Sequence, residues 1–226
     1  MRQVTIDTET TGLSTKNGDR IVEIGCVEII NRIITGKTWS SYCNPERSVG
    51  QHTIAITGIQ DQFLLDKPKF AAIAEDFLKF IDNAELIIHN AAFDIEFINY
   101  ELKLSNHKIK DLSSEFKIID TLALARSMHP GQRNNLDALC KRYNINIERT
   151  LHGALLDAEI LAKLVLKMTA GQISFNFDLS ENLNDIKQGA ELSKAVCKNV
   201  VQEKNLKIIY ANQEELKLHE VYCSEL

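Results

Sequence analysis

The sequence lacks paired cysteines, because its five cysteines are scattered singly and none belongs to a C-x-x-C motif. An odd set of isolated thiols is typical of a reducing compartment, so the sequence predicts neither a disulfide framework nor a zinc site. It also lacks an apolar run of the ~18 residues that a membrane helix needs, and its first residues predict a strand rather than a secretory leader. We therefore expect a cytoplasmic protein with no membrane partner.

Positive charge is also scarce, since 26 lysines and arginines stand against 31 acidic residues and the net charge is −5. A protein that holds nucleic acid mainly through a basic surface neutralises phosphates with Lys and Arg, so the composition argues against that class. It does not exclude a nucleic-acid enzyme whose bound metal ions supply positive charge locally. With 44% hydrophobic and 25% charged residues over 226 positions, the chain can form one large domain and an extension.

Hydrophobic periodicity predicts strands and helices that alternate after an initial hairpin. Apolar and β-branched runs predict strands at 2–8, 21–30, 33–42, 86–89 and 117–119. Apolar residues at helical spacing predict helices at 70–81, 91–102, 136–143 and 152–168, with a further helix that ends near Pro130. Strands that first form a meander and then alternate with helices indicate an α/β fold, in which a mixed β-sheet is flanked by α-helices.

Between these elements, the sequence also predicts loops and two helix caps. Residues 44–52 are predicted to be a loop, which opens at Asn44-Pro45, and residues 52–58 are also expected to be a loop. Asn90 is placed to cap the helix that follows it, and Asp120 is placed to cap the next one.

The first predicted strand delivers two carboxylates, Asp7 and Glu9, before Gly12 lets the backbone turn. Successive side chains on a strand alternate between faces, so both acids point to the same side. Two like charges this close repel, unless one takes up a proton or a cation lies between them. Oxygen ligands of this kind suit Mg²⁺ or Mn²⁺ better than zinc. The alternative is an acidic strand end that faces solvent, since short motifs often match by accident.

Three later residues are candidates to join this pair. Asp94 lies in the first turn of a predicted helix, where the helix dipole favours a carboxylate, and Asp157 lies within the last strong helix. Either acid can instead be a solvated surface residue. His152 precedes Asp157 by five residues, a rotation of about 140° on a helix. The two can share a site only if His152 lies at the helix start or in the preceding loop; otherwise His152 is a structural or surface residue.

Together these five positions resemble the DEDDh family of 3′→5′ exonucleases. The match consists of Asp7-x-Glu9, Asp94 within His-Asn-x-x-Phe-Asp, and His152-x4-Asp157, and it spans roughly residues 1–170. Segments 7–12, 61–68, 136–140 and 151–158 are similar to the proofreading subunits of bacterial replicative DNA polymerases. The resemblance implies a ribonuclease H-like sheet with a partly flexible C-terminal tail, and an enzyme that edits mismatched DNA primer ends.

The resemblance also implies a role for each residue. Asp7, Glu9 and Asp157 would ligate one Mg²⁺ or Mn²⁺ ion, and Asp7 would also touch a second ion, which Asp94 supports largely through water. Two ions about 4 Å apart can clamp the attacking and departing oxygens of an in-line phosphoryl displacement. His152 would act as the general base, because an unperturbed pKa near ~6.5 suits that task. The product would be a 5′-mononucleotide.

A single-stranded or frayed 3′ end of DNA is the substrate that the resemblance implies. The expected substrate-binding residues are Asp7, Thr8, Glu9, His52, Thr57 and Asp157. Family members often carry histidine at the position of Thr57, whose hydroxyl can still donate a hydrogen bond. An RNA-trimming exonuclease of the same family is an alternative, because the five catalytic residues do not distinguish sugars. A mainly structural, polymerase-stabilising subunit is another.

The C-terminal part of the chain differs in character from residues 1–171, which are expected to form the exonuclease domain. Residues 172–177 resemble a sliding-clamp-binding motif with Gln172, Phe175 and Phe177 as anchors, although they can also be a linker with incidental phenylalanines. Residues 178–190 are polar and predict a linker. Residues 191–226 resemble the tail through which the proofreading subunits bind the polymerase catalytic subunit, and such a short tail is expected to become ordered on binding.

Overall fold

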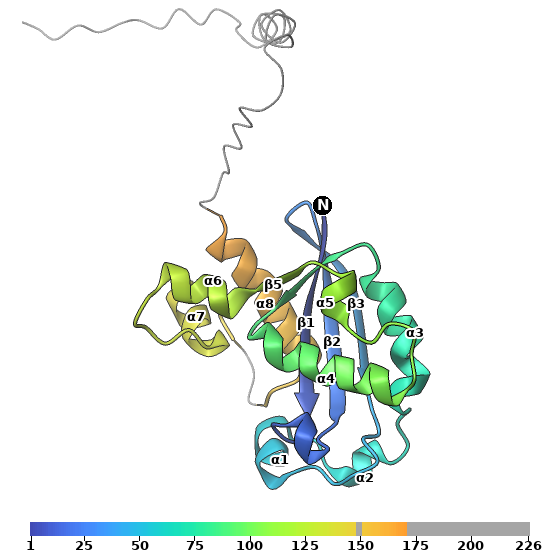
Figure 1. The fold of residues 1–226 in the computed structure, drawn as a ribbon. Helices are drawn as coiled ribbons and strands as arrows, with labels where there is room; N and C mark the ends of the chain where they lie inside the picture. The colour runs from blue at the N-terminus through green and yellow to red at the C-terminus, as the bar shows by residue number, and fades with distance from the viewer. Residues whose placement is uncertain (148–150, 171–226) are drawn as a thin grey trace, which may run out of the picture. The chain divides into compact units, whose positions relative to one another are not determined.

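The computed structural model describes residues 1–147 and 151–170 (Figure 1). The segments expected to bind partners, residues 172–177 and 191–226, lie outside the described residues, as does the linker expected at 178–190. Within the described ranges, no helix is both long and apolar enough to cross a membrane.

Five strands form one mixed sheet in the order β3-β2-β1-β4-β5. They are β1 (Arg2–Thr10), β2 (Ile21–Ile30), β3 (Ile33–Tyr42), β4 (Glu85–Ile88) and β5 (Ile118–Asp120). β1, β2 and β3 pair antiparallel, whereas β4 pairs parallel with β1 and with β5. Asn31 and Arg32 form the turn between β2 and β3 with φ of 48° and 66°, as a two-residue hairpin with matching twist requires. The predicted mixed sheet is confirmed.

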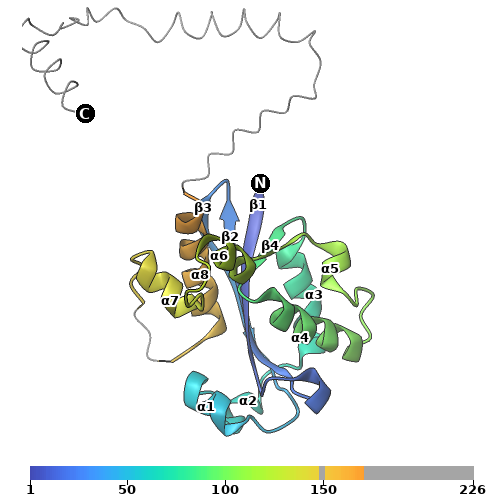
Figure 2. The same ribbon diagram turned by 60° about the vertical axis from the view of Figure 1, so that its left-hand side comes forward.

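Helices cover both faces of this sheet (Figure 2). α3 (Phe70–Ile81) and α4 (Ala91–Leu104) lie on one face, while α8 (Ala154–Met168) lies on the other, with α6 (Thr121–Met128) and α7 (Leu136–Arg142) beside it. β2 is buried from Ile21 to Ile29 because both of its faces are covered, which explains why its sequence is apolar almost without a break.

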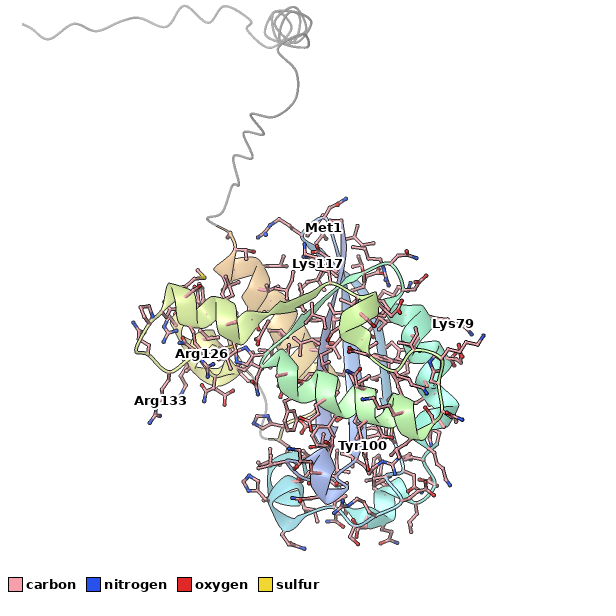
Figure 3. All side chains as sticks on the ribbon, viewed as in Figure 1. Met1, Lys79, Tyr100, Lys117, Arg126 and Arg133 are labelled. Carbon is pink, nitrogen blue, oxygen red and sulfur yellow. The ribbon has the colours of Figure 1, made fainter. Side chains whose placement is uncertain are left out.

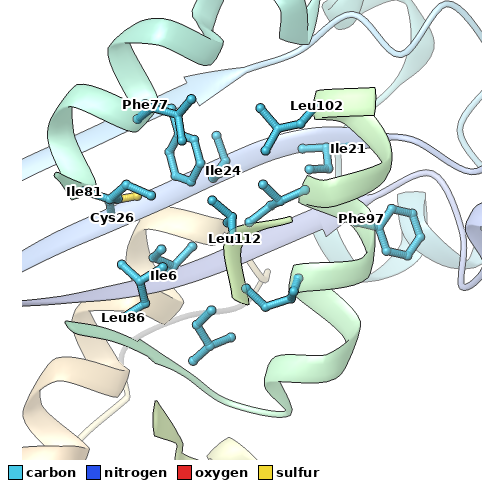
Figure 4. Close-up of a cluster of buried hydrophobic side chains, with 14 of the residues drawn as sticks. Ile6, Ile21, Ile24, Cys26, Phe77, Ile81, Leu86, Phe97, Leu102 and Leu112 are labelled. Atoms are coloured by element: carbon cyan, nitrogen blue, oxygen red, sulfur yellow. The ribbon is translucent and has the colours of Figure 1, made fainter. Parts of the chain in front are cut away.

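Each face of the sheet has its own apolar core. Under α3 and α4, one buried cluster includes Phe77, Phe97 and Ile6 of β1 (Figure 4). Between α8 and the sheet, a second cluster includes Leu161 and Val165. Burying one such side chain contributes about 1.5–3 kcal/mol, so both helical layers are held firmly to the strands that carry the candidate acids.

Charged side chains occupy the outward sides of these layers. Lys79, Lys117 and Arg133 are exposed and project from the molecule (Figure 3). α3 shows the pattern most clearly, because its apolar residues recur every three or four positions and it begins and ends at the residues that the sequence predicts. The remaining helical segments are short: η1 (Thr15–Asn17), α1 (Gln51–Thr57), α2 (Asp61–Leu64) and α5 (Leu112–Glu115).

Two local predictions are wrong and one is confirmed. Part of the two segments expected to be loops, 44–52 and 52–58, is the helix α1, which ends at Thr57 and is followed by Gly58 as its C-cap with a φ of 74°. Asn90 makes no side-chain cap, because it adopts a left-handed conformation (φ 66°); its backbone N–H instead donates to Asp120 Oδ1 at 3.2 Å. Asp120 does cap α6, since its carboxylate accepts from the N–H groups of Leu122 and Ala123.

Candidate active site

The end of β1 presents the two acids of the predicted metal site. Asp7 and Glu9 lie opposite Gly25 and Glu23 of β2, and directly opposite residues of an antiparallel pair share one face of the sheet. Side chains alternate along a strand, so Asp7 and Glu9 point to this face while Thr8 points to the other. Both acids are half-buried. The strand therefore offers adjacent carboxylates on the side that α8 covers.

Gly25 brings the start of α8 against these acids. A Cβ at this position would lie under 3.0 Å from backbone atoms of Ala154 and Leu155, so a larger residue would push the helix away. Because α8 begins only at Ala154, His152 lies in the preceding loop, and the helical rotation of about 140° between residues five apart does not apply to it. His152 Nδ1 lies 3.0 Å from Asp157 Oδ2.

Three of the five predicted residues meet at this point. Glu9, His152 and Asp157 each offer one ligand atom, and these atoms all lie within 4.8 Å of one another. The Asp157 side chain is 5% exposed and that of His152 42%, so the acid is buried and the imidazole faces solvent. Two carboxylates this close repel unless a cation lies between them, and their oxygens suit Mg²⁺ or Mn²⁺. The donor set therefore fits a divalent cation.

Asp94 approaches β1 from the opposite face of the sheet. It lies in the first turn of α4, and its Oδ1 accepts hydrogen bonds from Thr8 N at 3.0 Å and Thr8 Oγ1 at 2.7 Å. Burial raises the pKa of Asp94 to about 7, while the two bonds from Thr8 act in the opposite direction. A nearby cation would favour the ionised carboxylate. The structure thus ties Asp94 to the residue between Asp7 and Glu9.

The helix α1 holds the loop that carries His152. The backbone N–H of His152 donates to the carbonyl of Ile56 at 3.0 Å. Thr57 is buried, its hydroxyl donates to the Thr53 carbonyl at 2.9 Å, and the same oxygen accepts from Ile59 N at 3.1 Å. The Thr57 hydroxyl, which the sequence analysis expected to donate to the substrate, therefore already donates within the protein.

A cavity of about 480 Å³ opens beside this helix. Its lining includes Thr57, Leu151, Tyr42 and Phe63, and the rings of Tyr42 and Phe63 meet edge to face with centroids 4.9 Å apart. Apolar and aromatic walls next to the loop that carries His152 suit a nucleobase, which stacks on aromatic side chains. His52, the other residue predicted for this region, is exposed in the first turn of α1 and is not among the described lining residues.

Sequence reasoning missed Glu23, which lies among the predicted residues. Glu23 Oε2 accepts a hydrogen bond from the backbone N–H of Ala154 at 3.0 Å. The available signal was a glutamate followed two residues later by Gly25, inside an apolar run that predicts a buried strand. A buried acid in such a run requires a partner, but the sequence alone does not identify it.

Comparisons with known proteins identify the family of the chain. Residues 4–165 match the model of a protein family described as Exonuclease. The DNA polymerase III subunit epsilon of Salmonella typhimurium is 47% identical over 224 residues, which cover 97% of this chain and 90% of that protein. The epsilon subunit of Escherichia coli K12 is 46% identical over 224 residues, with the same coverage, and that of Buchnera aphidicola from Schizaphis graminum is 48% identical over 230 residues, covering 100% of this chain and 97% of that protein.

Solved structures share the fold. Exonuclease X in complex with 5′-overhanging duplex DNA superposes with a TM-score of 0.58 at 29% identity, covering 74% of this chain and 91% of that chain. The nuclease domain of 3′hExo, described as a DEDDh family member bound to rAMP, gives a TM-score of 0.65 at 17% identity, covering 75% of this chain and 92% of that chain. The second likeness concerns the fold alone.

Proposed function

The chain belongs to the exonuclease family, and within it to the DNA polymerase III epsilon subunits, and on that premise we propose that Asp7, Glu9, Asp94, His152 and Asp157 carry its reaction. The protein is a 3′→5′ exonuclease that proofreads for a bacterial replicative DNA polymerase. One observation supports the residue assignment above the others: atoms of Glu9, His152 and Asp157 lie within 4.8 Å of one another, although Glu9 is distant from the other two in the sequence.

The proposed metal ligands are Asp7, Glu9, Asp94 and Asp157, which would hold two Mg²⁺ or Mn²⁺ ions. Bound ions supply positive charge for the transferring phosphoryl group and lower the pKa of the attacking water. The protein's own part is to hold carboxylates from two strand positions and two helices around the end of β1. Thr8 assists, because its backbone N–H and hydroxyl fix one oxygen of Asp94 and leave that carboxylate little rotational freedom.

His152 is proposed as the general base. When Nδ1–H donates to Asp157 Oδ2, 3.0 Å away, Nε2 of the neutral ring is the proton acceptor. Asp157 thus sets both the orientation and the tautomer of the imidazole, as a carboxylate does for the base of a hydrolytic triad. The partial exposure of the ring lets it reach a water at the 3′ end of the strand. The products are a 5′-mononucleotide and a strand shorter by one residue.

The proposed substrate is a single-stranded or frayed 3′ end of DNA, and the end of β1 and the helix α1 are proposed to contact it. Thr57 would contribute through the shape of the cavity wall, because its hydroxyl already bonds within α1. His52 would meet the strand at the exposed side of α1. An unpaired end costs less to separate than a paired one, so mismatched ends would be removed faster.

Partners are proposed from the similarity to epsilon subunits. Residues 191–226 would bind the polymerase catalytic subunit, and Gln172, Phe175 and Phe177 would anchor residues 172–177 in a groove of the sliding clamp, with 178–190 as the linker. The low positive charge of the chain supports this arrangement, because a subunit that receives DNA from a polymerase does not need a basic surface of its own.

Digestion of 3′-labelled DNA and RNA, paired and mismatched, with and without Mg²⁺, tests the function. Asp7→Ala should abolish Mg²⁺-stimulated release of mononucleotides. Asp76→Ala is the matched control, since Asp76 lies on α3 with 72% of its side chain exposed. Mg²⁺-stimulated cleavage that persists in Asp7→Ala would refute the metal assignment, and equal rates on RNA would favour the RNA-trimming alternative.

A further inference from the structure

The helix α8 begins without a cap from its own sequence. Its N-cap residue is Gly153, which has no side chain to accept a hydrogen bond, although the first N–H groups of any helix need acceptors. Glu23 of β2, 131 positions earlier in the chain, supplies one, because its Oε2 accepts from Ala154 N at 3.0 Å. A carboxylate at this end of a helix is also favoured by the helix dipole.

Glu23 and Gly25 together form the seat for this helix. They are two positions apart on β2 and therefore share a face. Gly25 lets the backbone of α8 approach, and Glu23 bonds to it. Across the strand pair, Glu9 lies opposite Glu23 and Asp7 opposite Gly25. These two residue pairs of the β1–β2 ladder thus hold two candidate metal ligands on β1 and fix, from β2, the start of the helix that carries Asp157.

His152 is bracketed by bonds to two other elements. The backbone N–H of His152 donates to the carbonyl of Ile56 in α1 at 3.0 Å. Two residues later, the backbone N–H of Ala154 donates to Glu23 at 3.0 Å. Only Gly153, which has no side chain of its own, lies between the histidine and the second bond. The position of the imidazole therefore depends on where Glu23 holds the helix start.

Glu23 is a buried acid whose carboxylate is held by hydrogen bonds, of which the one from Ala154 N has the largest effect on its pKa. Glu23 is 5% exposed. Burial raises the pKa of its carboxyl, while hydrogen bonds from Ala154 and Tyr42 lower that pKa. Among the described residues, no Lys or Arg forms an ion pair with it. Glu28, equally buried on the same strand, pairs instead with Arg2 at 2.8 Å, which makes it a close comparison.

We propose that Glu23 is a positioning residue of the exonuclease reaction, which acts through His152 by fixing the start of α8. The proposal rests on the role of His152 proposed above. Removing the carboxylate lets the helix start and the loop before it relax. Since a displacement of about 1 Å in a catalytic group can cost roughly 10²-fold in rate, kcat should fall while KM for the DNA end changes little.

The first test compares Glu23→Ala with Glu23→Gln, using purified full-length protein and a single-stranded oligonucleotide. Glu23→Ala should lower kcat by about 10–100-fold, the range typical of mutations that remove the hydrogen-bond partner of a metal ligand. Glu23→Gln should retain most of the activity, because its amide oxygen accepts the same bond from Ala154. Glu28→Ala, the matched control, should lower the melting temperature without a comparable loss of kcat. Equal activity losses in Glu23→Ala and Glu28→Ala would overturn the proposal.

The second test is a double-mutant cycle with His152→Ala. A residue that acts through His152 should cost nothing further once the imidazole is gone, so Glu23→Ala/His152→Ala should match His152→Ala. If the double variant is slower by the full factor seen for Glu23→Ala alone, the proposal is wrong while the proposed function stands. If His152→Ala itself is fully active, the role proposed for His152 as the general base fails, and the positioning role of Glu23 fails with it. A raised Mn²⁺ requirement in Glu23→Gln would instead make Glu23 a metal ligand and also overturn the positioning role.

Discussion

Replacing Gly25 by alanine should damage the active site more than the fold. The added Cβ would lie under 3.0 Å from the backbone of Ala154 and Leu155, and backbone atoms cannot rotate away as a flexible side chain can. Restoring an ordinary carbon contact of 3.5–4.0 Å requires the start of α8 to move by roughly 1 Å. Overpacking of this kind costs about 1–3 kcal/mol of stability.

The activity should suffer in proportion to that movement. His152 and Asp157 lie on either side of the displaced turn, so the geometry around Glu9 is lost, and about 10²-fold in kcat is the expected cost, or roughly 2.7 kcal/mol of transition-state stabilisation. The assay is steady-state digestion of a 3′-labelled oligonucleotide, well below the melting temperature of the variant as measured by circular dichroism.

Gly36→Ala separates position from stability in this experiment. Gly36 has a φ of 81° with nothing within 4 Å of an added Cβ, so alanine there costs about 1–2 kcal/mol of backbone strain on the β-hairpin without moving α8. A Gly25→Ala variant that keeps wild-type kcat and melting temperature would refute the close approach on which the site geometry depends. Equal activity losses in both variants would show that stability, not position, is responsible.

Three further predictions concern the proposed base, the metal ions and the C-terminal part of the chain. His152→Ala should lower kcat by about 10²–10⁴-fold, the usual contribution of a general base, whereas His107→Ala, which alters an imidazole paired with Glu75, should not; an unchanged rate in His152→Ala would exclude it as the base. Mn²⁺ at about 100 times its dissociation constant should stabilise the wild type by about 2.7 kcal/mol, measured as a melting-temperature shift that EDTA reverses, and an equal shift in Asp7→Ala would contradict the ligand assignment. Ending the chain after Gly171 should preserve digestion of single strands while abolishing co-purification with a polymerase catalytic subunit, and loss of hydrolysis would place the tail within the nuclease.

Local sequence signals predicted the elements that carry the acids. Asp7 and Glu9 share a face because strand periodicity leaves no other choice, and the helix that carries Asp94 begins where its apolar spacing begins. Asp120 caps α6 through a bond to a residue two positions away, which is why the sequence alone could indicate it. Each of these features depends on neighbours within a few residues.

The features that the sequence did not predict depend on contacts between distant segments. α1 has seven residues, too few for a periodic pattern. Asn90 adopts a left-handed conformation, and its backbone N–H donates to Asp120 at the end of β5. The fit of α8 against Gly25 is likewise visible only when β2 and α8 are placed together. Local propensity is a weak guide at such points, since tertiary contacts routinely override it.

The placement of His152 outside α8 is itself a consequence of these distant contacts. On the helix, a histidine five residues before Asp157 would point about 140° away from it, and no choice of rotamer would bring the two together. Beginning the helix at Ala154 removes that restriction, but it leaves the histidine on a loop that needs external support. The hydrogen bonds that His152 N donates to the Ile56 carbonyl and Ala154 N donates to Glu23 provide it on either side. Ile56 belongs to α1, the helix proposed to contact the 3′ end of the DNA, so a direct backbone hydrogen bond joins that helix to the loop of the proposed general base.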